Sequence, residues 1–188
     1  EVLINKVIGE IESAGSQYGS INSGAGRKIM IEYSNVNTHK DYHIGHLRNL
    51  CLGDSLTRLF NFSGYKVIPV SYLNDLGIHV AKVLWKLNQI PENELPHKNL
   101  GHYLGELYTQ AAQELANDPV GQELVSLILR RLEAREQPEY SRWQETRQWS
   151  LDYFQKIYEE LDIHFDQTFF ESDFLDEGRK LVQEMLAK

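Results

Sequence analysis

The apolar residues of this chain recur with two different spacings. Between residues 2 and 13 they return every three or four positions, which is the period of an amphipathic helix. The stretches 28–34 and 65–73 are instead short and rich in β-branched and aromatic residues, which is typical of strands. Residues 44–63 lie between them and again show helical spacing. This order predicts a right-handed βαβ unit with parallel strands.

The rest of the chain is predominantly helical. Prolines and turn residues divide its middle into helices that we expect at 76–89, 98–117, 119–136 and 138–160. The alternating stretch 162–173 predicts a strand, and the last twelve residues predict a helix. We expect the first strand, 28–34, to be central, whereas Pro69 counts against the second because proline cannot donate to a sheet ladder.

The predicted fold class is therefore α/β, with half of a nucleotide-binding parallel sheet and a long helical insertion. We divide the chain into an N-terminal helix and linker, a βαβ half of the nucleotide-binding domain, a helical insertion, and a returning strand and helix. Their ranges are 1–26, 27–75, 76–161 and 162–188. A sheet with one crossover is incomplete, because its open edge and apolar faces need partners.

Composition narrows the class of protein. The 188 residues are 41% hydrophobic, which is enough for a packed core. A net charge of −8 argues against a broad nucleic-acid-binding surface, so we expect no DNA partner, although a local basic pocket stays open. No stretch of 18 apolar residues and no leader is seen, and we expect a soluble, cytoplasmic protein. Cys51, the single cysteine, excludes an internal disulfide, and we expect a buried thiol.

The stretch "NVNTHKDYHIGHLRN", residues 35–49, carries the candidate chemistry. It leaves the first strand at the carboxyl edge of the predicted sheet, where open α/β folds bind ligands. His43 and His46 flank the first turn of a helix, whose free N–H groups suit phosphate. Gly45 admits a flat ring close to the backbone, and Lys40 adds a mobile positive charge. The pattern predicts nucleotide binding with reaction at a phosphate.

Two other interpretations of these histidines stay open. Histidines at a helix start are often capping or surface residues without further function. A zinc site made by His39, Asp41, His43 and His46 lacks a recognisable ligand spacing and a cysteine partner, so we predict no metal site. The remaining histidines are isolated and should be structural or exposed; they are His79, His97, His102 and His164.

The extended stretch 31–77 resembles the arginyl-tRNA synthetases, a family of class I aminoacyl-tRNA synthetases. It has a Glu that ends the first strand, an Asn six residues before the first His, an HxGHLR motif, a Gly-Asp pair and a turn that ends in DxG. These residues are Glu32, Asn37, His43, His46, Leu47, Arg48, Gly53, Asp54, Tyr72, Asp75 and Gly77. The stretch 151–173, "LDYFQKIYEELDIHFDQTFFESD", is also similar to the family, so the resemblance runs from about Val2 to Asp173.

The resemblance implies an activity. Members of the family join L-arginine to ATP, with Mg²⁺, and then transfer arginine from the adenylate to tRNA(Arg). His43, Gly45 and His46 would bind ATP, and His43, His46 and Lys40 would be catalytic.

The resemblance also implies an arginine site. Asn37 would hold the α-amino and carboxylate groups, with Ser34 and Asn35 nearby, although many members carry a small serine in place of Asn35. Glu171 would grip the guanidinium, for which a carboxylate is the natural bidentate partner. Glu32 either joins this site or only anchors the end of its strand.

Three further charged residues have structural alternatives. We expect Asp54 to make a buried cap or a salt bridge, and Arg48 to pair with Asp41 or Asp54 rather than contact phosphate. Asp75 either lines the pocket or caps the next helix.

The family's lysine loop, second half-fold and anticodon-binding domain do not occur in the sequence, which starts at Glu1 rather than Met. We therefore expect a catalytic-domain fragment with weak or no aminoacylation activity alone. One alternative is a small HxGH-type nucleotidyltransferase, which would not need the helical insertion. The other is a non-catalytic synthetase-like binding module, against which the intact His43, His46 and Asn37 count.

Overall fold

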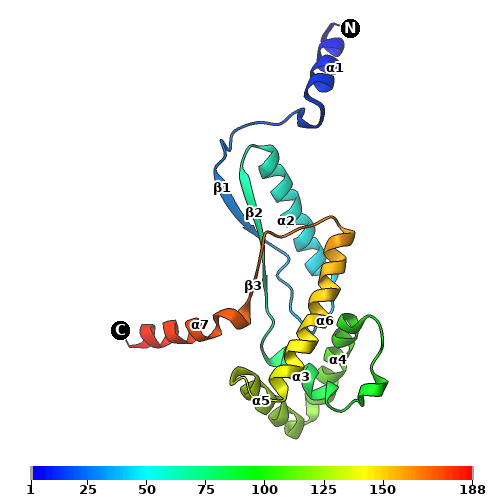
Figure 1. Ribbon diagram of the computed structural model, residues 1–188, viewed down its shortest axis with the longest axis vertical. Helices are drawn as coiled ribbons and strands as arrows, with labels where there is room; N and C mark the ends of the chain where they lie inside the picture. Colours follow the sequence, from blue (N-terminus) through cyan, green and yellow to red (C-terminus); the bar gives the residue numbers. More distant parts are fainter. Residues whose placement is uncertain (1, 188) are drawn as a thin grey trace.

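A computed structural model describes residues 2–187 as a three-stranded parallel sheet with helices on one face and at one end (Figure 1). The strands are β1 (Lys28–Glu32), β2 (Lys66–Leu73) and β3 (Gln167–Phe170), in the order β1-β2-β3. Helix α2 (Ile44–Phe62) crosses from β1 to β2. Four helices separate β2 from β3, and they are α3 (Ile78–Leu87), α4 (Leu100–Glu114), α5 (Pro119–Glu133) and α6 (Glu139–Glu160). The predicted α/β fold with a helical insertion is confirmed.

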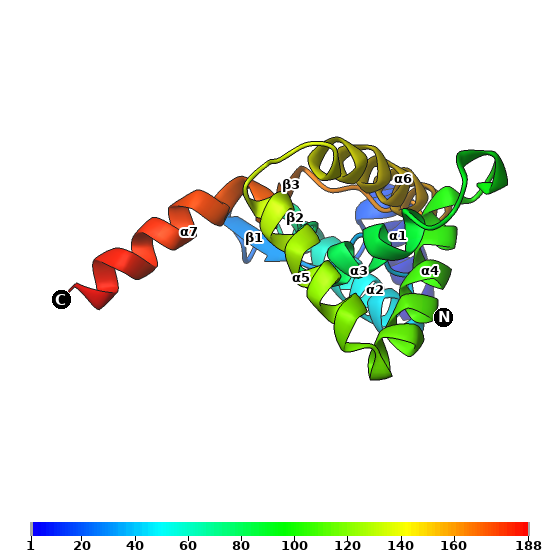
Figure 2. The same cartoon turned by 90° about the horizontal axis from the view of Figure 1, so that it is seen from below.

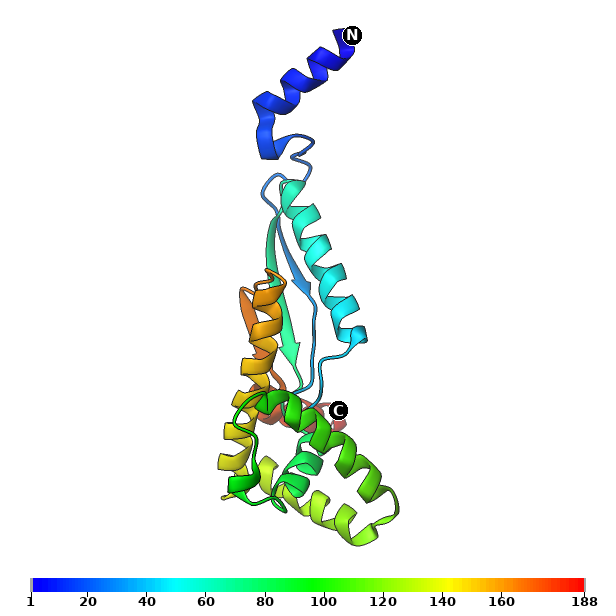
Figure 3. The same ribbon diagram turned by 90° about the vertical axis from the view of Figure 1, so that its right-hand side faces the viewer.

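Helix α2 and the C-terminal half of α6 lie side by side against one face of the sheet (Figures 1 and 3). One apolar cluster joins them, with Leu50 from α2, Tyr33 from the end of β1, and Phe154 from α6. The approach of α2 depends on Gly53, since a Cβ there would lie 2.1 Å from Cγ of Tyr33. The helices α3, α4, α5 and α6 are seen from below in Figure 2. A second cluster, which includes Leu84, fills the space between them. The insertion therefore has a core of its own.

The sheet order corrects the expectation for the first two strands. Within residues 2–187, β2 is the central strand and β1 lies at an edge. Pro69 is tolerated in the centre because pairing with β3 starts only at Val70, opposite Gln167. The Pro69 carbonyl still accepts from the Asp166 amide, at 2.9 Å, so the missing N–H lies where the β3 ladder has not yet begun.

Two further predictions were wrong in detail. The strand predicted at 162–173 is only β3, and helix α7 (Glu171–Leu186) begins six residues before the predicted helix start at 177. Cys51 is exposed rather than buried, because the apolar residues of α2 extend around both sides of the helix. Only Leu50, Gly53 and Thr57 of that helix are buried. Helix α1 (Val2–Ala14) and α7 project from the body and bury no residue (Figure 1).

The carboxylate of Asp75 explains why α7 starts early. Its side chain is fully buried and accepts from the backbone N–H and the hydroxyl of Ser172, at 2.9 and 2.7 Å. It also forms an ion pair with Nε of Arg147 on α6, at 2.7 Å. Trp143, one turn earlier on α6, donates its indole N–H to the Asp75 carbonyl, at 2.7 Å. Asp75 therefore caps α7, not α3, and joins the end of β2 to α6.

Replacement of Asp75 by Asn should strongly destabilise the chain. The amide keeps the size of the carboxylate but leaves the Arg147 guanidinium without its charged partner and weakens the cap of α7. We expect the free energy of unfolding to fall by about 2–4 kcal/mol. Urea unfolding at pH 7, followed by tryptophan fluorescence, measures the change.

Asp162→Asn is the matched control. Asp162 pairs with Arg58 at 3.7 Å, but its side chain is 83% exposed, so its loss should change stability by less than about 1 kcal/mol. Equal unfolding midpoints for the two variants would show that Asp75 does not have the structural role described.

Candidate functional site

His43 and His46 cap the N-terminus of α2. Nδ1 of His43 accepts from the Gly45 amide at 3.1 Å, and Nδ1 of His46 accepts from the His43 amide at 3.4 Å. Their rings stack at 3.7 Å with 17° between the planes. Because each Nδ1 accepts a hydrogen bond, the neutral form of each ring carries its own proton on Nε2. The capping interpretation is therefore confirmed, and it leaves two parallel N–H donors beside the helix terminus.

The environment of this pair favours a neutral His46. Burial lowers the pKa of His46, and the nearby His43 and Lys40 lower it further. Gly45 lies against the capping ring, since a Cβ there would be 3.0 Å from two ring atoms of His43. The first turn of α2 thus has two imidazole donors and a partially positive terminus, which together can hold an anion.

Lys40 and Asn37 lie on the loop that leads to this pair. Asn37 bridges to Asn74, and the Thr38 amide donates to the Asn74 carbonyl at 3.0 Å. These contacts extend the β1–β2 pairing past the strand ends and hold Asn37 at the carboxyl edge of the sheet. Nζ of Lys40 lies 4.6 Å from the centre of the Tyr108 ring on α4.

Ser34 and Asn35 form a strained turn after β1, with positive φ angles of 74° and 49°. The hydroxyl of Ser34 is buried and hydrogen-bonded to the Tyr158 hydroxyl at 2.8 Å. Asn35 donates to Oε1 of Glu32 at 2.8 Å and accepts from the Tyr72 amide at 3.2 Å. The Asn35 amide therefore anchors Glu32 to β2, while Ser34 is already committed to a partner on α6.

Glu171 is the first residue of α7 and follows β3 at the same edge of the sheet. It borders a cavity of about 620 Å³ together with Tyr72 and the apolar face of α7. Its Oε2 atom is buried and has no hydrogen-bond partner among residues 2–187. Burial raises the pKa of Glu171, and the nearby Asp75 raises it further. This carboxylate oxygen is suited to a charged donor from a ligand.

The structure decides between the alternatives that the sequence left open for Asp54 and Arg48. Asp54 forms a salt bridge with Arg58 at 2.7 Å, as expected. The expected pairing of Arg48 is wrong, because Asp54 is taken by Arg58, and Asp41 is taken by His102 at 2.6 Å. Arg48 is exposed at the start of α2. Within residues 2–187, no three His, Cys, Asp or Glu side chains lie where they could hold a metal ion.

The sequence interpretation missed the role of His39. It is fully buried, and burial together with the nearby His79 lowers its pKa to about 3. His79 is also buried, and its pKa is lowered to about 4, first by burial and then by Lys40. A histidine between two polar residues, "THK", gives no sequence signal for burial, because burial arises only when α6 packs on the loop.

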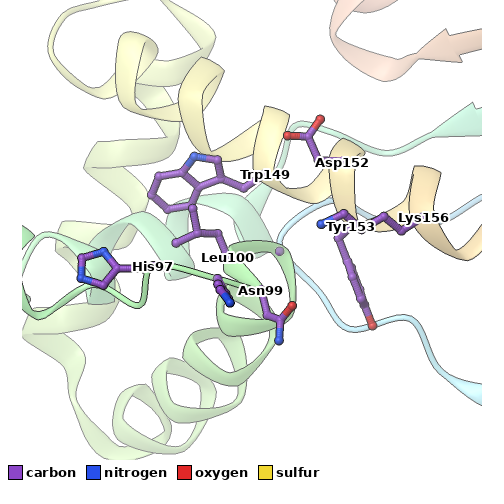
Figure 4. A pocket seen from close by; sticks show the side chains of 9 residues that line it. His97, Asn99, Leu100, Trp149, Asp152, Tyr153 and Lys156 are labelled. Atoms are coloured by element: carbon purple, nitrogen blue, oxygen red, sulfur yellow. The ribbon is translucent and has the colours of Figure 1, made fainter.

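A second cavity, of about 330 Å³, lies in the insertion (Figure 4). Trp149, Tyr153 and Lys156 reach it from α6, and His97 and Asn99 from the loop before α4. Its Tyr153 hydroxyl is next to the Tyr42 backbone. The cavity therefore borders the loop that precedes His43, on the side that faces the insertion helices.

Comparison with known proteins gives the family. The catalytic-domain model described as tRNA synthetases class I (R) matches residues 8–188. The chain belongs to the arginyl-tRNA synthetase family. This membership disfavours the alternative of a small HxGH-type nucleotidyltransferase. None of the described helices meets the length and hydropathy that a bilayer crossing requires.

The relatives of this arginyl-tRNA synthetase chain are much longer. The arginine–tRNA ligase of Bdellovibrio bacteriovorus is 36% identical over 167 residues, covering 86% of this chain and 29% of the relative. That of Halothermothrix orenii is 30% identical over 188 residues, 100% of this chain and 33% of the relative. The Thermus thermophilus arginyl-tRNA synthetase structure gives a TM-score of 0.64 at 26% identity, covering 86% of this chain and 26% of that one. The chain thus spans about a third of the length of the curated relatives it matches.

Stability should depend on pH through His39. Its pKa is about 3 in the folded chain and about 6.5 when unfolded, so the unfolded state binds more protons between these values. This contribution to stability is complete above pH 6.5 and is lost progressively as the pH falls toward 3. Urea unfolding should show that His39→Asn reduces the stability lost between pH 7 and pH 5 by about 2 kcal/mol.

His164→Asn provides the control for this comparison. The His164 side chain is 78% exposed, so its replacement should leave the loss between pH 7 and pH 5 unchanged. An identical loss in wild type and His39→Asn would contradict a neutral, buried His39.

Proposed function

We propose that the protein containing this chain is an arginine–tRNA ligase that uses ATP and Mg²⁺ to form arginyl-adenylate and then charges tRNA(Arg) in the cytoplasm. One observation carries the proposal. The stacked pair of His43 and His46 lies after one strand of the parallel sheet, and a carboxylate oxygen of Glu171 with no partner among residues 2–187 lies after another, both at the carboxyl edge. That edge is where open α/β folds bind ligands.

The ATP side of the proposed site is the first turn of α2. Its phosphates would accept hydrogen bonds from the Nε2–H groups of His43 and His46 and from the helix terminus. Lys40 would leave the Tyr108 ring to neutralise phosphate charge, and Gly45 would admit the adenine ring. Mg²⁺ would arrive with the phosphates, since no cluster of three metal-binding side chains occurs within residues 2–187.

The proposed arginine-binding part of the site lies at the same edge of the sheet, where Glu171 and Glu32 are located. The guanidinium would meet the buried carboxylate oxygen of Glu171, with Glu32 adding negative charge nearby. Asn37 would hold the α-amino and carboxylate groups. Asn35 would support the site through Glu32, while Ser34, which is buried against Tyr158, would contribute its backbone.

His46→Ala should abolish adenylate formation. The variant removes one donor to the phosphates and one cap of α2, and we expect arginine-dependent ATP–pyrophosphate exchange by the full-length protein to fall at least 100-fold. His97→Ala is the control, because His97 is exposed in the insertion loop. Unchanged exchange by the His46 variant would refute the role assigned to this residue.

Glu171→Gln should weaken arginine recognition selectively. A neutral amide cannot form two charge-assisted bonds with a guanidinium, so the KM for arginine should rise roughly 100-fold while the KM for ATP stays the same. The same exchange assay, with each substrate varied in turn, measures both. The matched control is Asp173→Asn on the exposed side of α7. A parallel rise in both KM values would mean that Glu171 acts on the fold rather than on arginine.

A further inference from the structure

We propose that His39 is a positioning residue that fastens the loop before His43 to helix α6, so that the insertion sets the geometry of the ATP side. The proposal rests on the proposed function, because it assumes that this loop serves the reaction. His39 itself is buried and does not face the site.

His39 is held at three points. Its backbone N–H donates to the Ser150 hydroxyl at 2.9 Å. Its Nδ1 lies 2.9 Å from the Thr38 hydroxyl, and its Nε2 lies 2.8 Å from the Thr146 hydroxyl. Thr146 and Ser150 are four residues apart on α6 and therefore share one face of that helix. The φ angle of His39 is 59°, a left-handed conformation that is uncommon for non-glycine residues.

The hydrogen bonds of Thr146 favour one tautomer of His39. The Thr146 hydroxyl lies 2.8 Å from the Arg142 carbonyl, and when it donates its single proton there, its oxygen accepts from Nε2–H of His39. Nδ1 is then unprotonated and accepts from the Thr38 hydroxyl. Every polar atom of the ring is thus satisfied in the neutral form, and none is left for a ligand or a metal.

The two residues after His39 contact the insertion as well. Lys40 packs its ammonium on the Tyr108 ring, and Asp41 pairs with His102, both on α4. Residues 39–41 therefore contact α6 and α4 in succession, and only Tyr42 separates them from the His43 cap. With so short a connection, a shift of α6 moves Lys40 and His43 together.

Thr146→Val tests this link. Valine has the volume of threonine but offers His39 no hydroxyl. In the full-length protein we expect kcat for arginine-dependent pyrophosphate exchange to fall roughly 10- to 100-fold with little change in the KM for arginine. Thr146→Ser, which keeps the hydroxyl, should restore kcat. Thr109→Val is the control, since within the described residues that hydroxyl donates to the Gly105 carbonyl of its own helix and does not contact the loop before His43.

A second readout is independent of activity. NMR titration of the wild-type chain and the variants measures the pKa of His46. Thr146→Val should move this pKa toward its ordinary value, because Lys40 and His43 shift. Thr109→Val should leave it unchanged. Ser150→Ala, a smaller loss, should act in the same direction and serves if Thr146→Val does not fold.

The outcomes separate the two proposals. Variants that lose stability but keep the wild-type kcat and His46 titration would overturn the positioning role. Absence of arginine-dependent exchange in the wild-type protein would overturn the proposed function, and the titration would still decide whether His39 links the loop to α6.

Discussion

The buried carboxylate of Asp75 is the interaction on which the arrangement of this chain depends. It stands at the end of the central strand, and its partners come from α6 and from the start of α7. A carboxylate that is shielded from solvent needs hydrogen-bond donors around it, and Arg147 and Ser172 supply these donors to Asp75. The position of Glu171, between Phe170 and Ser172, follows from that constraint, because Arg147 also stacks on the Phe170 ring at 4.0 Å.

The histidine cap has a similar logic at the other end of the sheet edge. A helix that begins at a binding site needs its first N–H groups partly satisfied and partly free. Here the Nδ1 atoms of two imidazole rings accept hydrogen bonds from two backbone amides, and the N–H group on the other side of each ring remains as a donor. The cap depends in turn on the loop before it, which contacts α6 and α4 rather than the sheet alone. The insertion is therefore a support for the site edge as well as a separate helical layer.

Much of this could be predicted from the sequence because it depends on local pattern. Helical and strand spacing located nearly every element, and the HxGHLR stretch located the start of α2. The misses come from long-range contacts. The early start of α7 depends on Asp75, distant in sequence from Ser172, and the burial of His39 depends on Thr146 and Ser150. The exposure of Cys51 and of Arg48 likewise depends on which residues the fold brings next to them, and local spacing does not determine this.

The charges along the sheet edge are separated, and this separation gives a direction to the proposed site. Near α2, the histidines are hydrogen-bond donors and Lys40 is a positive charge that helps to lower the pKa values of His46 and His79. Near α7 the charges are negative. Burial raises the pKa of Tyr72, and the nearby carboxylates of Glu171, Asp75 and Glu32 raise it further. A triphosphate is attracted to the first end and repelled from the second, while a guanidinium has the opposite preference. Arginine would therefore enter with its carboxylate toward the phosphates. In a chain of net charge −8, that polarity rests on one lysine, two imidazole donors and a helix terminus on the phosphate side.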